Sequence, residues 1–541
     1  MTDIARHRGL MIACLAACGG APAADDSQGV GSNATTQTGS ADGTDADASS
    51  GASEAATAAA SGGSTEGSDD DTASSTGSDE TGDDTGPPPP PECGDGSCGA
   101  LETCSSCADD CGACPENCDD PDVLCVDDAP GSEFSTIQDA VDAAVGGDTV
   151  LVFAGAYAGF QVDHSGEPGA RIEIRAAEPG VQLVDPADGP TVASSCDEAP
   201  AGICIVGSDE LAGVHDVVIE GFEIADMPRS CVVARSANPG VAGESSPHLR
   251  LVIRTMKCTQ AGHEGFYLSQ VGSSLIEGND IVDAGANGDD RGHGIYMANA
   301  GCDDSVLRGN TIHWDGALGP PEGAGIHLNG DLTVEGNGGG DGVITGITIE
   351  GNRIWGADHN GINMDGVRAS RIAGNLIYGN ARHAITGYAI DAAAGPADLH
   401  IVGNTLVVPS FGTGAPIRLH EDDGGHVFFD NIALVEGGGP SISVESTAIV
   451  SDYNVLGAAF AIADEDVDLA QWQAEGLDTN SLVVSDLAEL FVGASDHHLV
   501  DGAVAIDAGI ADLAEVAAPV FDLDGVVRPV GGAHDIGAYE R

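Results

Sequence analysis

Residues 325–331 read GIHLNGD and residues 361–367 read GINMDGV, and the same pattern recurs four more times. The related stretches are GFYLS (265–269), GIYMA (294–298), AITGY (384–388) and PIRLH (416–420). Each row has an apolar residue at one common position: Phe266, Ile295, Ile326, Ile362, Ile385 and Ile417. Six copies of one short pattern indicate a repeat protein in which each coil contributes an equivalent strand.

A second repeat runs between these rows: EGNDI (277–281), RGNTI (308–312), EGNRI (350–354), AGNLI (373–377), VGNTL (402–406) and FDNIA (429–433). Its asparagines are Asn279, Asn310, Asn352, Asn375, Asn404 and Asn431, separated by 31, 42, 23, 29 and 27 residues. A base period near 23 with insertions is typical of a solenoid whose loops emerge on one side. Asparagine suits a recurring tight turn because it tolerates left-handed φ and its amide can bond backbone groups. We therefore predict a structural role for these residues.

The rows of the first repeat also predict which side chains face outward. Successive side chains of a strand alternate between faces, so the position two after the apolar residue points inward as well. That inward position holds Leu268, Met297, Leu328, Met364, Gly387 and Leu419. A first outward column holds Tyr267, Tyr296, His327, Asn363, Thr386 and Arg418, and a second holds Ser269, Ala298, Asn329, Asp365, Tyr388 and His420. Because coils stack about 4.8 Å apart, we expect both columns to lie on one exposed wall.

The content of this wall is typical of a carbohydrate groove, since flat rings contact sugar faces and forked donors bind carboxylates. We expect His327, His420, Arg418 and Tyr296 to serve as acid–base and carboxylate-binding groups. Substrate contacts are expected from Tyr267, Asn363, Tyr388, Arg382 and His383. The oxygens of Asn329, Asp331 and Asp365 suit a hard cation such as Ca²⁺, and the alternative is that they are solvated turn residues.

Three segments resemble right-handed parallel β-helix proteins of the pectate-lyase-like superfamily. They are STIQDAVDAAVGGDTVLVFAGAYAGFQV (135–162), the Gly-Asn repeat, and the end AIDAG…DLDGVVRPVGGAHDIGAYER (505–541). The resemblance covers residues 126–541 and implies an all-β, right-handed parallel β-helix solenoid. It also implies a helix at Phe134–Ala144 that caps the first coil, and a C-terminal segment packed against the last coil.

Members of this superfamily include pectate lyases, alginate lyases, chondroitinase B, polygalacturonases and mannuronan epimerases. The resemblance therefore implies a polysaccharide lyase that acts by β-elimination on a glycan containing uronic acid. Many β-helix lyases use a lysine base, but the single lysine, Lys257, lies outside the columns, which leaves His327, His420, a tyrosine or Arg418. A hydrolase is less favoured, because GHG (292–294) matches one polygalacturonase fragment with no NTD before it, and we interpret His293 as a loop residue. The alternative function is a non-catalytic module that binds a glycan or a partner.

The chain begins with MTDIARHRGLMIACLAACGG, in which two arginines precede a short apolar run and small residues. This pattern predicts a signal peptide over residues 1–18, and its LAAC ending resembles a lipobox that implies lipidation of Cys18. The alternative is an ordinary secretory signal. Residues 19–92 hold 15 acids without Lys or Arg and too few large apolar groups to fold, which predicts a disordered tether. We expect a cell-surface lipoprotein of the outer membrane that is attached by its lipid alone.

Residues 93–125 contain eight cysteines. In an oxidising compartment so short a segment needs covalent support, which favours a disulfide-rich module over a zinc site. Cys196 and Cys204 are close enough in sequence to pair, and Cys231, Cys258 and Cys302 are expected to be buried or partly paired. The net charge of −69 makes nucleic acid a poor partner. We expect a monomer whose partner is a polysaccharide.

Overall fold

The computed structural model describes residues 118–127, 132–184, 200–207, 213–235, 247–288, 291–298, 301–315, 319–320, 322–331 and 341–541. The expected signal peptide with Cys18, the tether and most of the cysteine module (93–117) lie outside these residues. Within the described part of the chain, no helix is long and apolar enough to cross a membrane.

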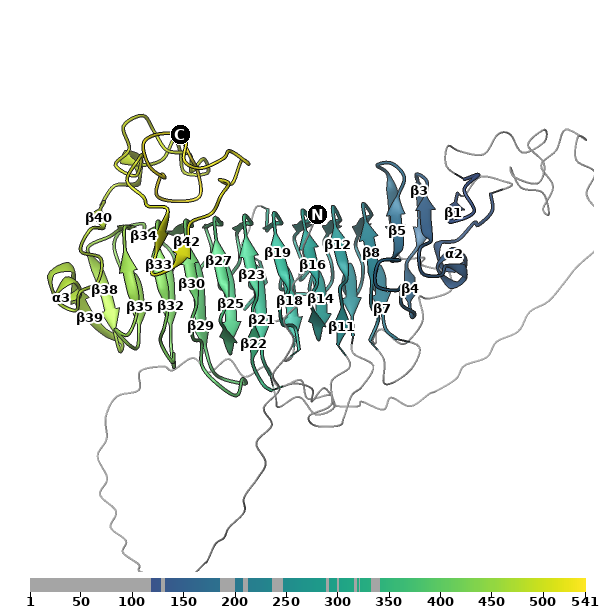
Figure 1. Cartoon of the computed structure of the whole chain (residues 1–541), viewed down its shortest axis with the longest axis horizontal. Helices are drawn as coiled ribbons and strands as arrows, with labels where there is room; N and C mark the ends of the chain where they lie inside the picture. Colours follow the sequence, from purple (N-terminus) through teal and green to yellow (C-terminus); the bar gives the residue numbers. More distant parts are fainter. Residues whose placement is uncertain are drawn as a thin grey trace, which may run out of the picture. The chain divides into compact units, whose positions relative to one another are not determined.

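Three long sheets are built from one short strand each per coil (Figure 1). Sheet A contains β1 (Val123–Val126), β2 (Thr149–Val152), β5 (Ile172–Ala176), β8 (Val217–Glu220), β12 (Val252–Arg254), β16 (Leu275–Glu277), β19 (Val306–Arg308), β23 (Thr348–Glu350), β27 (Arg371–Ala373), β30 (His400–Val402), β33 (Val427–Phe429) and β36 (Val450–Asp452). Sheet B contains β3 (Gly155–Ala158), β6 (Val181–Val184), β9 (Glu223–Ala225), β13 (Lys257–Thr259), β17 (Asp280–Val282), β20 (Thr311–His313), β24 (Arg353–Trp355), β28 (Leu376–Tyr378), β31 (Thr405–Val408), β34 (Ile432–Val435), β37 (Val455–Leu456) and β40 (Leu482–Val483). Sheet C contains β4 (Phe160–Val162), β7 (Ile203–Ile205), β10 (Val232–Ala234), β14 (Phe266–Ser269), β18 (Ile295–Ala298), β21 (Ile326–Asn329), β25 (Ile362–Asp365), β29 (Ile385–Tyr388), β32 (Ile417–Leu419), β35 (Pro440–Val444), β38 (Ala459–Ile462) and β39 (Glu465–Asp468).

Within each coil the chain passes from sheet A to sheet B and then to sheet C. Two short parallel pairs, β11 (His248–Leu249) with β15 (Val271–Gly272) and β22 (Ile344–Thr345) with β26 (Val367–Arg368), join neighbouring coils beside the main sheets. The core fills the inside of the coils. The apolar positions of the six rows, such as Ile326 and Leu328, are fully buried there, which confirms the predicted inward alternation.

The predicted asparagine ladder is continuous and buried. From Asn310 onward, the side-chain oxygen of each asparagine accepts from the backbone N–H and the side-chain amide of the asparagine one coil earlier, as Asn375 does from Asn352 at 2.9 and 3.0 Å. A seventh member, Asn454, extends the ladder beyond Asn431. The left-handed residue of each turn is the one before the asparagine, for example Gly374 with φ of 61°. The asparagine itself therefore acts through its amide and not through left-handed φ.

The two ends of the solenoid are covered by helices. At the start, α2 (Ile137–Ala143) is capped by Thr136 and buries Ile137 and Val141, which confirms the predicted capping helix with slightly narrower bounds. At the other end, antiparallel β39 leads into α3 (Leu469–Ala474), whose buried Trp472 stacks on Phe460 at 4.7 Å. Such covers keep the terminal strands from pairing with other chains.

We expect from the sequence that the C-terminal segment packs against the last coil. In the structure it extends beyond that coil. Leu490 of this segment, just after the 3-10 turn Leu487–Glu489, packs with Leu434 of β34. Further along, Leu523 packs with Leu376 of β28, two coils before β34. The short hairpin β41 (Asp512–Leu513) and β42 (Val516–Ala517) lies against Phe429 of sheet A. Buried apolar side chains on the outer faces of the coils provide this docking surface, so the segment runs along several coils.

Cysteine pairs stabilise the first half of the solenoid. Cys118 and Cys125 are joined, and Cys125 already belongs to β1. Cys231 and Cys258 form a bond between adjacent coils, and Cys302 is buried and free, so the expectation of burial and partial pairing is confirmed. Cys204 is disulfide-bonded, while its expected partner Cys196 lies outside the described residues.

Candidate functional site

The predicted wall exists on the outer face of sheet C. Strand register pairs Tyr267 with Tyr296, Tyr296 with His327, and so on through Asn363 and Thr386 to Arg418. The second column follows the same register from Ser269 to Tyr388. His420 comes directly after β32, and its backbone N–H donates to Gly387 O at 2.8 Å. Lys257 lies in β13 of sheet B and is not part of the wall.

The wall is less exposed than the sequence predicted. Asn363 and Asp365 are buried, at 3% and 2% exposure, and the aromatic residues of the first column are half-buried. Residues that lie beside the strands cover these side chains. The backbone N–H groups of residues 390–392 donate to the carboxylate of Asp365, at 3.0 and 3.4 Å to Oδ1 and 2.8 Å to Oδ2. An outward position in a strand is therefore not always a solvent-exposed one.

Tyr296 and His327 form the most tightly organised part of the wall, together with His293. The rings of Tyr296 and His327 lie 4.8 Å apart, and His327 Nδ1 is 3.2 Å from His293 Nε2. Asn329 Nδ2 donates to the Tyr296 hydroxyl at 3.2 Å. His327 Nε2 is buried and has no hydrogen-bond partner in the part of the chain that the structure describes. The group thus combines a phenol and an imidazole with an unused ring nitrogen.

Burial determines the charge states of these two side chains. It lowers the pKa of His327 well below its usual 6.5, and the nearby His293 and His359 lower it further. It also raises the pKa of Tyr296, with a smaller contribution from Tyr267. At neutral pH His327 is therefore a neutral imidazole and Tyr296 a protonated phenol.

Tyr267 extends the group by one coil. Its ring meets that of Tyr296 edge-on, with centroids 5.7 Å apart. The guanidinium of Arg229 lies 5.0 Å from the Tyr267 ring centroid and is paired with the buried carboxylate of Glu264. A paired arginine beside an aromatic ring offers a polar platform with little net charge.

A second group lies one and two coils further along the wall. Asn363 Nδ2 donates to the Tyr388 hydroxyl at 2.7 Å, and Asn360 Nδ2 donates to Asn363 Oδ1 at 3.0 Å. His383 accepts the backbone N–H of Ala415 on Nδ1 at 2.8 Å. Burial, helped by the charge of Arg418, lowers the pKa of His383 to about 3. The neighbouring Arg382 donates its backbone N–H to His359 O at 3.0 Å.

Arg418 and His420 form a third group with acidic partners. Arg418 Nη2 is 3.4 Å from Asp464, and His420 Nδ1 is 3.4 Å from Glu445. His420, Glu445 and Asp464 also lie close enough together to hold a metal ion. His327 is three coils away, about 14 Å at the usual strand spacing. The four predicted catalytic side chains therefore do not converge on one reacting atom: Tyr296 and His327 form one pair, and Arg418 and His420, which both approach Asp464, form another.

The oxygen atoms near Asn329 partly fit a hard cation. Asn329 Oδ1 is buried and has no hydrogen-bond partner within the described ranges, and Asp331 follows two residues later with 7% exposure. Burial raises the pKa of the Asp391 carboxyl, and the negative charge of Asp331 raises it further. Asp365 differs, since both of its carboxylate oxygens already accept backbone N–H groups. The residues that would offer oxygen ligands to Ca²⁺ here are Asn329, Asp331 and Asp391.

A third column lies two residues before each apolar position and was not predicted. Its polar members are Glu264, His293, Asn360 and His383, of which only His383 was predicted as a site residue. These residues precede their strands, so strand alternation does not describe them. A glycine follows three of them. A Cβ on one of these glycines, Gly294, would lie 2.2 Å from Ile312 Cγ2, so the chain can pass there only without a side chain. The signal in the sequence that could have identified this column is a polar residue directly before each of these three glycines.

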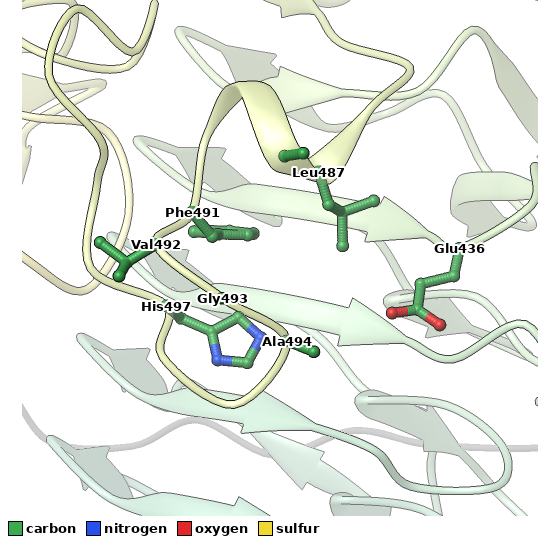
Figure 2. A pocket seen from close by; sticks show the side chains of 8 residues that line it. Glu436, Leu487, Phe491, Val492, Gly493, Ala494 and His497 are labelled. Atoms are coloured by element: carbon green, nitrogen blue, oxygen red, sulfur yellow. The ribbon is translucent and has the colours of Figure 1, made fainter.

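A separate cavity lies between the C-terminal segment and the outer face of the coils (Figure 2). It measures about 240 Å³ and is lined mainly by apolar residues of the segment, among them Leu487, Phe491 and Val492. His497 also lines it, is 3% exposed and has no partner for Nδ1. None of the predicted site residues contributes to this cavity.

Comparison with known proteins identifies the architecture. A family model described as "Right handed beta helix region" matches residues 194–431. Together with the three parallel sheets, this match decides the fold. The chain is a right-handed parallel β-helix protein. No curated protein sequence matches it significantly.

Three solved structures illustrate how far the likeness of this β-helix extends. A pectate lyase, Pel9A, aligns with a TM-score of 0.46 and 14% identity over 76% of this chain and 92% of its own. XylC in complex with xylose aligns with a TM-score of 0.44 and 12% identity over 77% and 98%. PfbA, a surface adhesin of Streptococcus pneumoniae, aligns with a TM-score of 0.41 and 11% identity over 60% and 82%. Identities this low concern the β-helix fold alone.

Proposed function

We propose that the sheet C wall binds an extracellular polysaccharide containing uronic acid and cleaves it by β-elimination. One observation carries the proposal. Tyr296 and His327 stand side by side on the outer face, half-buried and hydrogen-bonded to their neighbours, with a buried nitrogen of His327 left unused. A buried polar atom without a partner costs free energy, which is regained when a ligand supplies one.

The β-elimination requires only a few steps. The proton beside the uronate carboxylate leaves, the bond from the neighbouring carbon to the glycosidic oxygen breaks, a carbon–carbon double bond forms, and the leaving oxygen takes a proton. Tyr296 Oη, when ionised, is the group that removes the first proton and can return it to the leaving oxygen. His327 Nε2 lies on the same part of the wall and contacts a substrate oxygen.

Substrate binding extends beyond this centre in both directions. Tyr267 and the Arg229–Glu264 pair lie one coil before it, and Asn363 with Tyr388 lie after it. Arg418 is the furthest cation along the wall and would contact a sugar acid several units away.

Calcium enters the proposal at Asn329, Asp331 and Asp391. A cation bound there would neutralise the substrate carboxylate and offset the charge of Asp331, which contributes to the raised pKa of Tyr296. The proposal also includes the anchor: lipidation of Cys18 would attach the β-helix to the cell surface at the end of its tether.

The test uses the full chain with pectate, alginate and chondroitin in the presence of Ca²⁺, and follows the absorbance of the unsaturated product. Tyr296→Phe and His327→Ala are expected to lose about 10²-fold or more in rate. Tyr378→Phe is the matched control, because Tyr378 is half-buried on sheet B, away from the wall, and should leave the rate unchanged. Because burial raises the pKa of Tyr296, the rate should also increase toward alkaline pH.

One observation favours a second function, a non-catalytic glycan-binding module. The polar side chains form three separate groups along the wall, as expected for binding an extended chain. Retained binding of uronans with no product from any of the three would support this function and refute the elimination.

A further inference from the structure

A short chain of hydrogen bonds leads from the backbone to the outer edge of His327. The backbone N–H of Ala324 points at His293 Nδ1, at 3.1 Å. His293 Nε2 is in turn 3.2 Å from His327 Nδ1. The His293 ring is buried and the His327 ring is half-buried, and their planes meet at 77°, edge to face. Three groups in series therefore determine where the imidazole protons can be.

The backbone N–H of Ala324 sets the direction of both hydrogen bonds in this series. A backbone N–H can only donate, so His293 Nδ1 must accept and cannot carry a proton. The proton of the neutral His293 ring is then on Nε2, which donates to His327 Nδ1. His327 Nδ1 accepts, and its own proton must be on Nε2, the atom that has no partner among the described residues.

We propose that His293 is a positioning residue that holds His327 as the Nε2–H tautomer, so that His327 presents a hydrogen-bond donor to a negatively charged oxygen of the substrate. The second half of this statement rests on the proposed function, and the first half does not. A neutral imidazole in this role stabilises developing negative charge without transferring its proton. His327 is thereby excluded as the base, and Tyr296 is the remaining proton-accepting group of the pair.

The substrate class follows from the same geometry. Along this part of the wall His327 offers its Nε2–H, and Tyr296 offers its hydroxyl while the phenol is protonated. Such a surface recognises an oxygen-rich anion, such as the carboxylate of a uronic acid, and discriminates against a cationic amino sugar at this position.

The direct test is the tautomeric state of His327, measured in the full chain with ¹⁵N-labelled histidine and long-range ¹H–¹⁵N correlations. The His327 signal is assigned by its absence in His327→Gln. His293→Phe keeps the ring volume and removes both nitrogens, while His293→Gln keeps a side-chain N–H donor. His497→Phe, in the cavity of the C-terminal segment, is the control for replacement of a buried histidine elsewhere.

The expected result is an Nε2-protonated pattern for His327 in the wild type, His293→Gln and His497→Phe, and its loss in His293→Phe. Protonation on Nδ1 in the wild type, or an unchanged pattern in His293→Phe, would overturn the inference. Circular dichroism verifies that each variant is folded. A wild type that cleaves no uronan but shows the Nε2–H pattern refutes the proposed function and leaves the role of His293 supported.

Where cleavage is found, a second readout applies. His293→Phe should lower kcat about tenfold with a smaller change in KM, and His293→Gln should recover most of it, in line with the effect of other orienting residues. Equal loss in the two variants would contradict a role that acts through the donated hydrogen bond.

Discussion

Replacing Asn375 with alanine removes the centre of the buried asparagine ladder. The side chain of Asn375 is fully buried and makes four hydrogen bonds. Its Nδ2 donates to Ile349 O and Asn404 Oδ1, both at 2.9 Å. Its Oδ1 accepts from the backbone and side-chain amides of Asn352, at 2.9 and 3.0 Å.

The cost can be worked out bond by bond. The backbone N–H of Asn352 loses its acceptor in a buried turn, which costs about 1–3 kcal/mol. The other three bonds are lost from groups that keep another partner or can relax, at about 0.5–1 kcal/mol each. Asn375→Ala should therefore destabilise the coil by about 2.5–6 kcal/mol. Asn380→Ala is the control, because Asn380 Oδ1 accepts one backbone N–H, at 2.9 Å, and its Nδ2 has no partner. We expect about 1–3 kcal/mol there.

Hydrogen exchange is the suitable assay, because the coils of a solenoid need not unfold together. In Asn375→Ala, exchange of the Asn352 amide should accelerate about 10²–10⁴-fold, since each 1.4 kcal/mol is a factor of ten. Urea unfolding of the full chain gives a second measure. A loss below about 1 kcal/mol, or one equal to that of Asn380→Ala, would refute the argument that the ladder amides stabilise the turns.

Three further predictions concern other parts of the molecule. Replacing Cys231 and Cys258 with serine should cost about 3.5 kcal/mol in urea unfolding for their sequence separation of 27, and no loss would contradict the constraint on the unfolded chain. Burial raises the pKa of Asp430 from 3.8 to about 7. The free energy of unfolding should therefore fall as pH rises between these values, by at most about 4 kcal/mol. Asp430→Asn should remove this pH dependence in thermal unfolding. Calcium should raise the Tm of the wild type, and this rise should be lost in Asn329→Ala and in Asp391→Asn. Calorimetry with and without a chelator measures it. Equal rises in the wild type and both variants would exclude the site.

Local patterns predicted the repeating part of the fold. The six rows aligned on residues such as Ile326 and Ile362 pair in the predicted register, because the inward positions must all be apolar to bury the core. The asparagine ladder and the capping helix could also be predicted, since a turn and a helix N-cap depend on only a few consecutive residues.

The composition of the candidate site was only partly predictable. Register alone placed His327 beside Tyr296 and about 14 Å from Arg418, and the sequence contained that information once the coils were counted. His293 and Asn360 were missed because they precede their strands, where alternation no longer indicates the direction of a side chain. Their contacts depend on the bend at the following glycine.

The amino-acid sequence by itself determined the repeat, the inward and outward faces of each strand, and which residues share a column. The tertiary structure alone decided that the wall is half-buried, that Asp365 is engaged by the backbone of residues 390–392, and that the C-terminal segment lies along several coils. The physical reason is the range of the interactions. Strand alternation and turns act over a few residues and recur with every coil, whereas the covering of an outer face depends on loops and a terminal segment that are distant in sequence and have no period.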